Sequence, residues 1–391
     1  MATVQPTDFG KYTLLERIGV DPMAELYRAS RLNRHGKPQP VLIKKFLPQV
    51  AKNQKLIRLI SNSARISSLF KHDNIVEIID FGFVEDAFYI ATAYLSGHSL
   101  QHLLKISRER RRPFTPQHAL HIAAQICRAL TYAHEFKDPS GQYSAVIHGN
   151  LCPDTVFITL DGEAKLTDFG VHAANTRESN PQLDQINTWM AYMSPEQVAA
   201  DAPDHRSDIF SLGILLYEML TGQQMFHGKS MEVFSMIRHV KFEPIDKAAP
   251  HCPSRLHSLI SQSVRKAPDD RYASAREMLE AIEKVLSGLP KPTFDHGLSD
   301  YFSTLPRRQV TDDEKNAVGA AQTPQGTAKE PKEAVSTVHR TKPGSPPADT
   351  KTQGRKKEAH REVTARDDPK EKAKPPLAPE RTNRGCKGPK S

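Results

Sequence analysis

The sequence HGNLCPDTVFITLDGEAKLTDFG, residues 148–170, decides the fold. A short polar segment leads into two runs of apolar and β-branched residues, which predicts a strand pair that ends at DFG. A DFG triplet alone is a weak signal. The triplet becomes informative about the fold because other short motifs flank it in a fixed order. These motifs are VLIK (41–44), YMSPE (192–196), DIFSLG (208–213) and DDRYAS (269–274).

The first 95 residues are rich in predicted strands. Short alternating or β-branched runs occur at residues 12–18, 25–30, 40–46, 76–84 and 87–95. One helical stretch, from Gln54 to about Leu69, interrupts them.

Helical periodicity dominates from Leu100 onward. Residues 119–134 form an amphipathic pattern, and residues 209–220 read as a buried helix. The chain is therefore predicted to be α+β and two-lobed, with a small β-rich lobe over about 8–95 and a larger helical lobe over about 96–288. Such an asymmetric pair of lobes favours a ligand cleft between them.

The charge of the chain is unevenly placed. The 391 residues carry a net charge of +9, of which +2 belongs to residues 1–290 (33 Lys and Arg against 31 Asp and Glu) and +7 to residues 291–391 (21 against 14). Residues 306–391 contain no aromatic residue, five valines and one leucine. This Pro-rich, mixed-charge basic tail is predicted to be disordered, and it offers no stacking surface for specific nucleic-acid binding.

A short segment, residues 289–305, joins the two regions. Leu298, Tyr301, Phe302 and Leu305 share one face of a predicted helix. This helical extension either docks on the domain or binds a partner.

The sequence favours a cytoplasmic protein. It shows no secretory signal and no apolar run long enough to span a membrane. The four cysteines are scattered without metal-ligand spacing, which fits a reducing compartment.

The ordered motifs make residues 12–286 resemble the protein kinase family. Within it, LIKKFLPQVA (42–51), HDNIVEIIDFG (72–82) and YMSPEQ (192–197) are similar to bacterial Ser/Thr kinases of the eukaryotic type. The resemblance implies a two-lobed kinase fold and phosphoryl transfer from Mg·ATP. It also implies structural roles for four residues, with Glu196 paired to Arg271, Asp208 holding the catalytic loop and His148 packed beneath it.

The phosphate-binding loop departs from the family pattern GxGxxG. Gly19 keeps the first glycine, but Asp21, Pro22 and Ala24 follow it. Asp21 places a carboxylate where a triphosphate would pass, and Pro22 removes a backbone donor. The alternative is a tolerated loop variant.

The strand lysine of the family is matched by Lys44, but its helix partner is missing. Counting back from His72 places Ser63 at the position of the usual glutamate. No acidic residue occurs between Lys44 and Asp73, so a one-turn shift cannot supply one.

The catalytic loop, HRDxxxxN in the family, is degenerate. Asn150 replaces the aspartate that accepts the substrate proton, and an amide cannot act as that base. Thr155 replaces the asparagine that binds the second Mg²⁺, and Gly149 replaces the arginine. Asp154 lies one residue before the metal position.

Some nucleotide positions are retained. Asp168 is intact and would bind one Mg²⁺ by resemblance, so the sequence leaves open whether ATP and Mg²⁺ bind weakly or not at all. Leu42 and Phe157 are bulkier than the usual residues of the adenine pocket. The full set of cofactor-binding positions implied by the resemblance is Ile18, Gly19, Leu26, Lys44, Ala93, Leu95 and Asp168.

Three functions compete at this point. The first is a pseudokinase that acts as a scaffold or allosteric partner in Ser/Thr phosphorylation signalling, with an active kinase or its substrate as the protein partner. The second is a weak or unconventional ATP-dependent Ser/Thr kinase that uses Lys44 and Asp168. The third is an adaptor that works through the basic tail.

Overall fold

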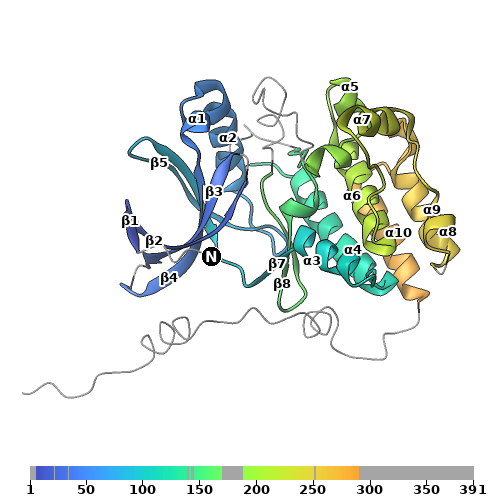
Figure 1. Ribbon diagram of the computed structural model, residues 1–391, viewed down its shortest axis with the longest axis horizontal. Helices are drawn as coiled ribbons and strands as arrows, with labels where there is room; N and C mark the ends of the chain where they lie inside the picture. Colours follow the sequence, from blue (N-terminus) through green and yellow to red (C-terminus); the bar gives the residue numbers. More distant parts are fainter. Residues whose placement is uncertain are drawn as a thin grey trace, which may run out of the picture. The chain divides into compact units, whose positions relative to one another are not determined.

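The computed structural model describes residues 6–21, 23–33, 35–138, 141, 145–169, 188–250 and 252–289. Within them, a lobe built on a β-sheet is followed by a lobe built mainly of helices (Figure 1). The predicted two-lobed α+β fold is thus confirmed. The expected extension after Leu289 and the expected tail at 306–391 lie outside the described residues. No helix within the described ranges is long and apolar enough to cross a membrane.

The N-terminal lobe contains a six-stranded antiparallel sheet with the order β1-β2-β3-β4-β6-β5. Along β4, Val41 and Ile43 are buried in a core with Tyr12. Because side chains alternate along a strand, Leu42 and Lys44 point to the opposite face. The strands are β1 (Thr7–Phe9), β2 (Tyr12–Val20), β3 (Ala24–Leu32), β4 (Pro38–Phe46), β5 (Ile78–Val84) and β6 (Ala87–Ala93).

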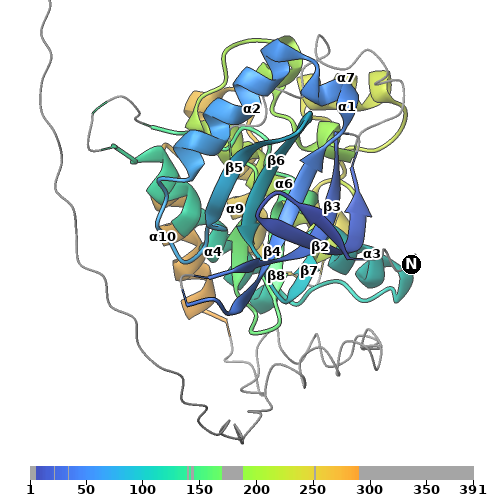
Figure 2. The same cartoon turned by 90° about the vertical axis from the view of Figure 1, so that its left-hand side faces the viewer.

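Two helices follow β4, namely α1 (Pro48–Ala51) and α2 (Gln54–Ser67). Helix α2 lies beside β5 in Figure 2 and buries Ile60 in a cluster with Phe46 and Ile90. Phe46 is two residues from Lys44, so α2 covers the face of the sheet that carries the lysine. The Asn53 side chain begins α2 by accepting a hydrogen bond from the Leu56 N–H.

The C-terminal lobe surrounds α6, which is buried continuously from Ser207 to Leu220 as its apolar sequence predicts. Figure 1 shows α4 and α10 beside it. The helices of this lobe are α3 (Leu100–Glu109), α4 (Pro116–His134), α5 (Pro195–Ala199), α6 (His205–Thr221), α7 (Ser230–His239), α8 (Ile245–Ala248), α9 (Ser254–Ser263) and α10 (Ala275–Ser287).

A small sheet, with the order β7-β8-β9, lies where the lobes meet. Its strands are β7 (Gly97–Ser99), β8 (Val156–Thr159) and β9 (Ala164–Leu166), and the last two are the predicted strand pair. Strand β7 was not predicted, because three residues are too few to show a period. The N–H of Val76 donates to the carbonyl of Leu166 at 2.9 Å. This contact pairs Val76 with the end of β9 instead of with the large sheet, and β5 begins at Ile78, two residues later than the sequence predicted.

Candidate functional site

Lys44 lies between two carboxylates that come from different lobes. Its Nζ is 3.3 Å from an oxygen of Asp168, which follows β9, and 3.3 Å from an oxygen of Asp21, which follows β2. The Lys44 side chain is only 18% exposed. Burial lowers the pKa of Lys44, but Asp168 and Asp21 outweigh it and hold the pKa above the ordinary lysine value. The ammonium group is therefore fully charged and fully paired.

The loop between β2 and β3 folds around the Asp21 side chain. Asp21 Oδ1 accepts hydrogen bonds from the backbone N–H groups of Met23 and Ala24, each at 2.7 Å. The Asp21 N–H in turn donates to the carbonyl of Ala24 at 2.8 Å. Gly19 lies in β2 opposite Leu26. The sequence analysis predicted a carboxylate in this loop, but it did not predict the hydrogen bonds that the carboxylate accepts. The signal was available, because aspartate side chains commonly accept N–H groups two or three residues onward.

Helix α2 brings no carboxylate to the sheet face that carries Lys44. Its sequence, QKLIRLISNSARIS, contains neither aspartate nor glutamate, and Ser63 is half-buried within it. The carboxylates bound to Lys44 therefore come from the β2–β3 loop and from the end of β9 instead.

Asp168 is held by its neighbours in the chain. Its backbone lies in the left-handed region, with φ of 59°, and the next residue, Phe169, is buried. The Phe169 ring packs against His148 at 4.6 Å and against Phe70 at 5.3 Å between ring centroids. These contacts fix the position from which Asp168 reaches Lys44.

Asp208 organises the loop that begins at His148. Its carboxylate accepts the N–H groups of His148 at 2.8 Å and Gly149 at 2.7 Å, and it contacts His134 Nε2 at 2.8 Å. Burial alone would raise the pKa of Asp208, but the contact with His134 and the charges around it lower the pKa below its usual range. The ring Nε2 of His148 lies 2.9 Å from the carbonyl of Thr167, which joins the loop to the segment before Asp168.

Asn150 and Thr155, which depart from the family pattern of this loop, differ in their contacts. The Thr155 hydroxyl lies 3.0 Å from the Cys152 carbonyl and 3.2 Å from that of Asn150, and it accepts the Cys152 N–H at 3.1 Å. Thr155 is buried, and its hydrogen bonds close the loop on itself. The Asn150 side chain makes no hydrogen bond to another described residue, whereas Asp154 is exposed.

The expected adenine positions gather around the same sheet face. Leu26 is directly opposite Lys44 in the β3–β4 register, and Leu42 is opposite Thr92, so these four side chains share a face. The N–H of Ala93 is used, because it donates to the Glu77 carbonyl at 3.1 Å. The remaining expected positions, Ile18, Leu95 and the bulky Phe157, are half-buried.

Glu196 and Arg271 form the ion pair that the resemblance implies. Arg271 donates to both carboxylate oxygens of Glu196 at 2.7 Å, and its side chain is fully buried. Burial raises the pKa of Glu196, but the hydrogen bonds from Arg271 and Ser207 lower it further, to below the usual value. The pair joins the first turn of α5 to the turn before α10.

Two contacts of this lobe were missed from the sequence. The Gln197 side chain donates to the Gly149 carbonyl at 2.8 Å, which ties α5 to the loop after His148. Glu218 is fully buried on α6 and binds Arg108 at 2.5 Å as well as the Tyr192 hydroxyl. The sequence signal for the contacts of Glu218 was a charged residue within an otherwise apolar helix, because such a residue needs a partner when it is buried.

The charged groups that a bound Mg·ATP would meet are paired with one another in this structure. Asp168 is engaged by Lys44, and Lys44 is engaged by Asp21. No cluster of three or more His, Cys, Asp or Glu side chains suited to a metal occurs in the described part of the chain. The one ammonium group of this centre, that of Lys44, is thus shared between two carboxylates of the chain itself.

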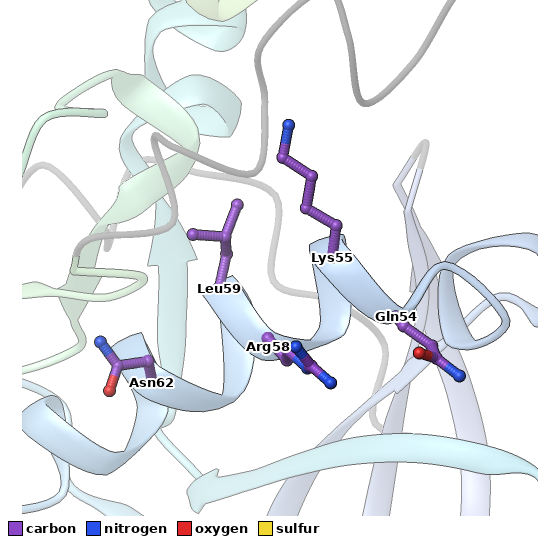
Figure 3. Close-up of a pocket in the computed structure, with 5 residues that line it drawn as sticks. All are labelled: Gln54, Lys55, Arg58, Leu59 and Asn62. Atoms are coloured by element: carbon purple, nitrogen blue, oxygen red, sulfur yellow. The ribbon is translucent and has the colours of Figure 1, made fainter. Parts of the chain in front are cut away.

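Surface hollows also lie away from this centre. One runs along α2 and is lined by Lys55, Leu59 and their neighbours, with these two side chains projecting from the same side of the helix (Figure 3). Another lies beside α7, around Met236. Neither includes Lys44 or Asp168.

Comparisons with known proteins agree with this architecture. A family model described as a protein kinase domain matches residues 12–282. Tyrosine-protein kinase MasK of Myxococcus xanthus is 30% identical over 280 residues, covering 71% of this chain and 43% of MasK. Serine/threonine-protein kinase PrkC of Bacillus subtilis is 31% identical over 271 residues, covering 69% of this chain and 39% of PrkC.

Serine/threonine-protein kinase PknB of Mycobacterium tuberculosis is 29% identical over 288 residues, covering 72% of this chain and 44% of PknB. The chain thus spans less than half the length of these curated relatives. The crystal structure of the Mycobacterium tuberculosis PknI kinase domain shares the fold, with a TM-score of 0.55 and 22% identity over 73% of this chain and 99% of that one. The chain belongs to the protein kinase family.

Proposed function

We propose that this protein is a pseudokinase that acts as a scaffold or allosteric partner in Ser/Thr phosphorylation signalling. The observation that carries the proposal is the loop after His148. By resemblance, Asn150 matches the family's catalytic base and Thr155 matches a metal ligand, and the Thr155 hydroxyl is turned into the loop. General-base assistance contributes about 10² to 10⁴ in rate, and an amide cannot provide it.

The rest of the lobe supports a binding role. Asp208 holds the backbone of the loop, and the Glu196–Arg271 pair anchors the first turn of α5. These contacts keep a defined surface without requiring chemistry. A kinase domain implies protein partners or substrates, and we propose an active kinase or its substrate as the partner.

We propose that the protein works in the cytoplasm and without specific nucleic-acid binding. The described cysteines, Cys127, Cys152 and Cys252, are all free and buried, which suits a reducing compartment. The basic tail mixes its charges and lacks aromatic residues. If the tail rather than the domain captures the partner, deleting residues 306–391 will abolish capture while leaving the domain folded.

A weak kinase is the second candidate. Lys44 and Asp168 are both present and 3.3 Å apart, and the relatives carry kinase names. In this alternative, a nucleotide would have to separate the two residues and use them with Mg²⁺.

Transfer of labelled phosphate from Mg·ATP to a generic protein acceptor separates the two candidates. We expect the full chain to give the same background as Asp168→Ala. Turnover above that background, lost in Asp168→Ala, would establish the weak kinase instead. Glu135→Gln, a change to an exposed residue far from Asp168 in the sequence, serves as the matched control.

A further inference from the structure

The Asp21 carboxylate is bound by the kind of donors that protein kinases present to a phosphate. Two backbone N–H groups of its own loop donate to Oδ1, and the Lys44 ammonium pairs with Oδ2 at 3.3 Å. Backbone N–H groups of a tight loop together with a lysine are a common anion-binding combination. In this chain the anion is part of the loop itself.

We propose that Asp21 is an internal anion that occupies the phosphate site and thereby excludes the phosphates of a nucleotide. The inference extends the proposed function, on which it rests, because it concerns affinity for nucleotide rather than transfer of phosphate. It assigns to Asp21 a specificity role, as the residue that sets which anions Lys44 and the loop can bind.

Proximity gives the internal carboxylate an advantage over any dissolved anion. Asp21 is only one residue from Pro22 and two from Met23, so its binding to the loop carries no cost of association. The carboxylate and the lysine are both partly shielded, with 33% and 18% of their side chains exposed. A phosphate would have to displace Asp21 from three donors and then remain beside its negative charge.

The second carboxylate at Lys44 adds to the exclusion. Asp168 also lies 3.3 Å from Nζ, so one ammonium group already balances two negative charges. A triphosphate entering this site would add like charge to an uncompensated pair, which is unfavourable unless cations accompany it. Removing the charge of Asp21 restores a net balance between Lys44 and Asp168.

Two substitutions separate the charge of Asp21 from its hydrogen bonds. Asp21→Asn removes the charge and keeps an oxygen that can accept from Met23 and Ala24. Asp21→Gly removes both and frees the loop N–H groups. The matched control is Glu25→Gln on β3, because Glu25 is a nearby carboxylate that pairs with Arg17 at 2.9 Å and not with Lys44.

The experiment is calorimetric titration of the full-length wild type and variants with ATP, inorganic tripolyphosphate and adenosine, each with and without Mg²⁺. We expect both Asp21 variants to bind ATP and tripolyphosphate about tenfold or more tightly than the wild type, with Asp21→Gly the stronger. Adenosine affinity stays unchanged, Glu25→Gln behaves as the wild type, and adding Lys44→Met to Asp21→Gly removes the gain. Melting temperatures verify that every variant is folded.

Polyphosphate affinity in both Asp21 variants no tighter than in the wild type would overturn the inference. A gain that survives Lys44→Met would also overturn it, because the anion would then bind elsewhere. Turnover by the wild type would refute the proposed function alone, since these affinities are measured without any acceptor or phosphoryl transfer.

Discussion

Arg271 shows how one buried side chain holds distant segments together. Its guanidinium donates to both oxygens of Glu196 and to the carbonyls of Arg206, Arg265 and Lys266, so every N–H has a partner. The guanidinium also lies over the Phe210 ring at 4.9 Å. Because the Arg271 charge is out of contact with water, the stability of the folded domain depends on Glu196 remaining ionised as its counter-ion.

Glu196→Gln is expected to destabilise the domain by about 3–5 kcal/mol, because it leaves the buried Arg271 charge without a counter-ion. Glu135→Gln removes the carboxylate of an exposed pair with Arg276 and should not change the unfolding midpoint measurably. Urea denaturation compares the two variants. Equal midpoints would show that the buried pair adds nothing.

Glu196 and Asp208 make the stability of the domain depend on pH in the acidic range. The pKa values of Glu196 and Asp208 are lowered in the folded state, so both groups stabilise the fold above the ordinary carboxylate pKa of about 4. This stability is lost as the pH falls below about 4, because the unfolded chain then takes up protons first.

We therefore expect the unfolding free energy of Glu196→Gln to fall less steeply below pH 4 than that of the wild type. Glu135→Gln should keep the wild-type slope. Denaturant titrations at a series of acidic pH values provide the measurement. An unchanged slope in Glu196→Gln would contradict the pKa direction assigned to Glu196.

At the scale of elements, how well the sequence predicted each one depended on its length. Strands β2, β3, β4 and β6 and helices α2, α4 and α6 were predicted because each is long enough to show its period. Strand β7 was missed, because its three residues depend on pairing with β8, which is about 60 residues later in the sequence.

Gly97 is the residue that lets β7 approach β8. Its φ is 155°, and a Cβ there would lie 2.1 Å from the Ile158 carbonyl oxygen, a backbone atom that cannot move aside. Gly97→Ala should therefore destabilise the domain by about 1–3 kcal/mol or more.

Gly36→Ala is the matched control for Gly97→Ala. Gly36 also has a positive φ, of 71°, but a Cβ there would meet nothing within 4 Å. Thermal melting of both variants separates backbone strain from the steric clash. If the two variants melt together, the close approach of β7 and β8 has no energetic weight.

The site was predicted as a set of positions but not as a set of contacts. The resemblance to the family proposed Lys44, Asp168, Asn150 and Thr155 as site positions, because each matches a place in one of its motifs. The pairing of Lys44 with Asp21 depends on how the β2–β3 loop turns, and that turn follows from backbone hydrogen bonds that no spacing specifies. The inward Thr155 hydroxyl is likewise a consequence of loop closure.

At the scale of the whole molecule, the contacts fall into two groups, one that joins segments of the helical lobe and one that surrounds Lys44. The contacts that join segments of the helical lobe, centred on Asp208 and Arg271, are complete. The contacts centred on Lys44, the strand lysine of the family pattern, are made within the chain, to Asp21 and Asp168. This division leads us to separate the fold of the family from its chemistry.

Intact-mass spectrometry after prolonged incubation with millimolar Mg·ATP and a generic acceptor protein tests the central claim most directly. Our account predicts that neither the full chain nor the acceptor gains the mass of a phosphate, with Asp168→Ala as the reference. A phosphate adduct that forms with the wild type and is absent with Asp168→Ala would contradict the account and assign the chain to the active kinases.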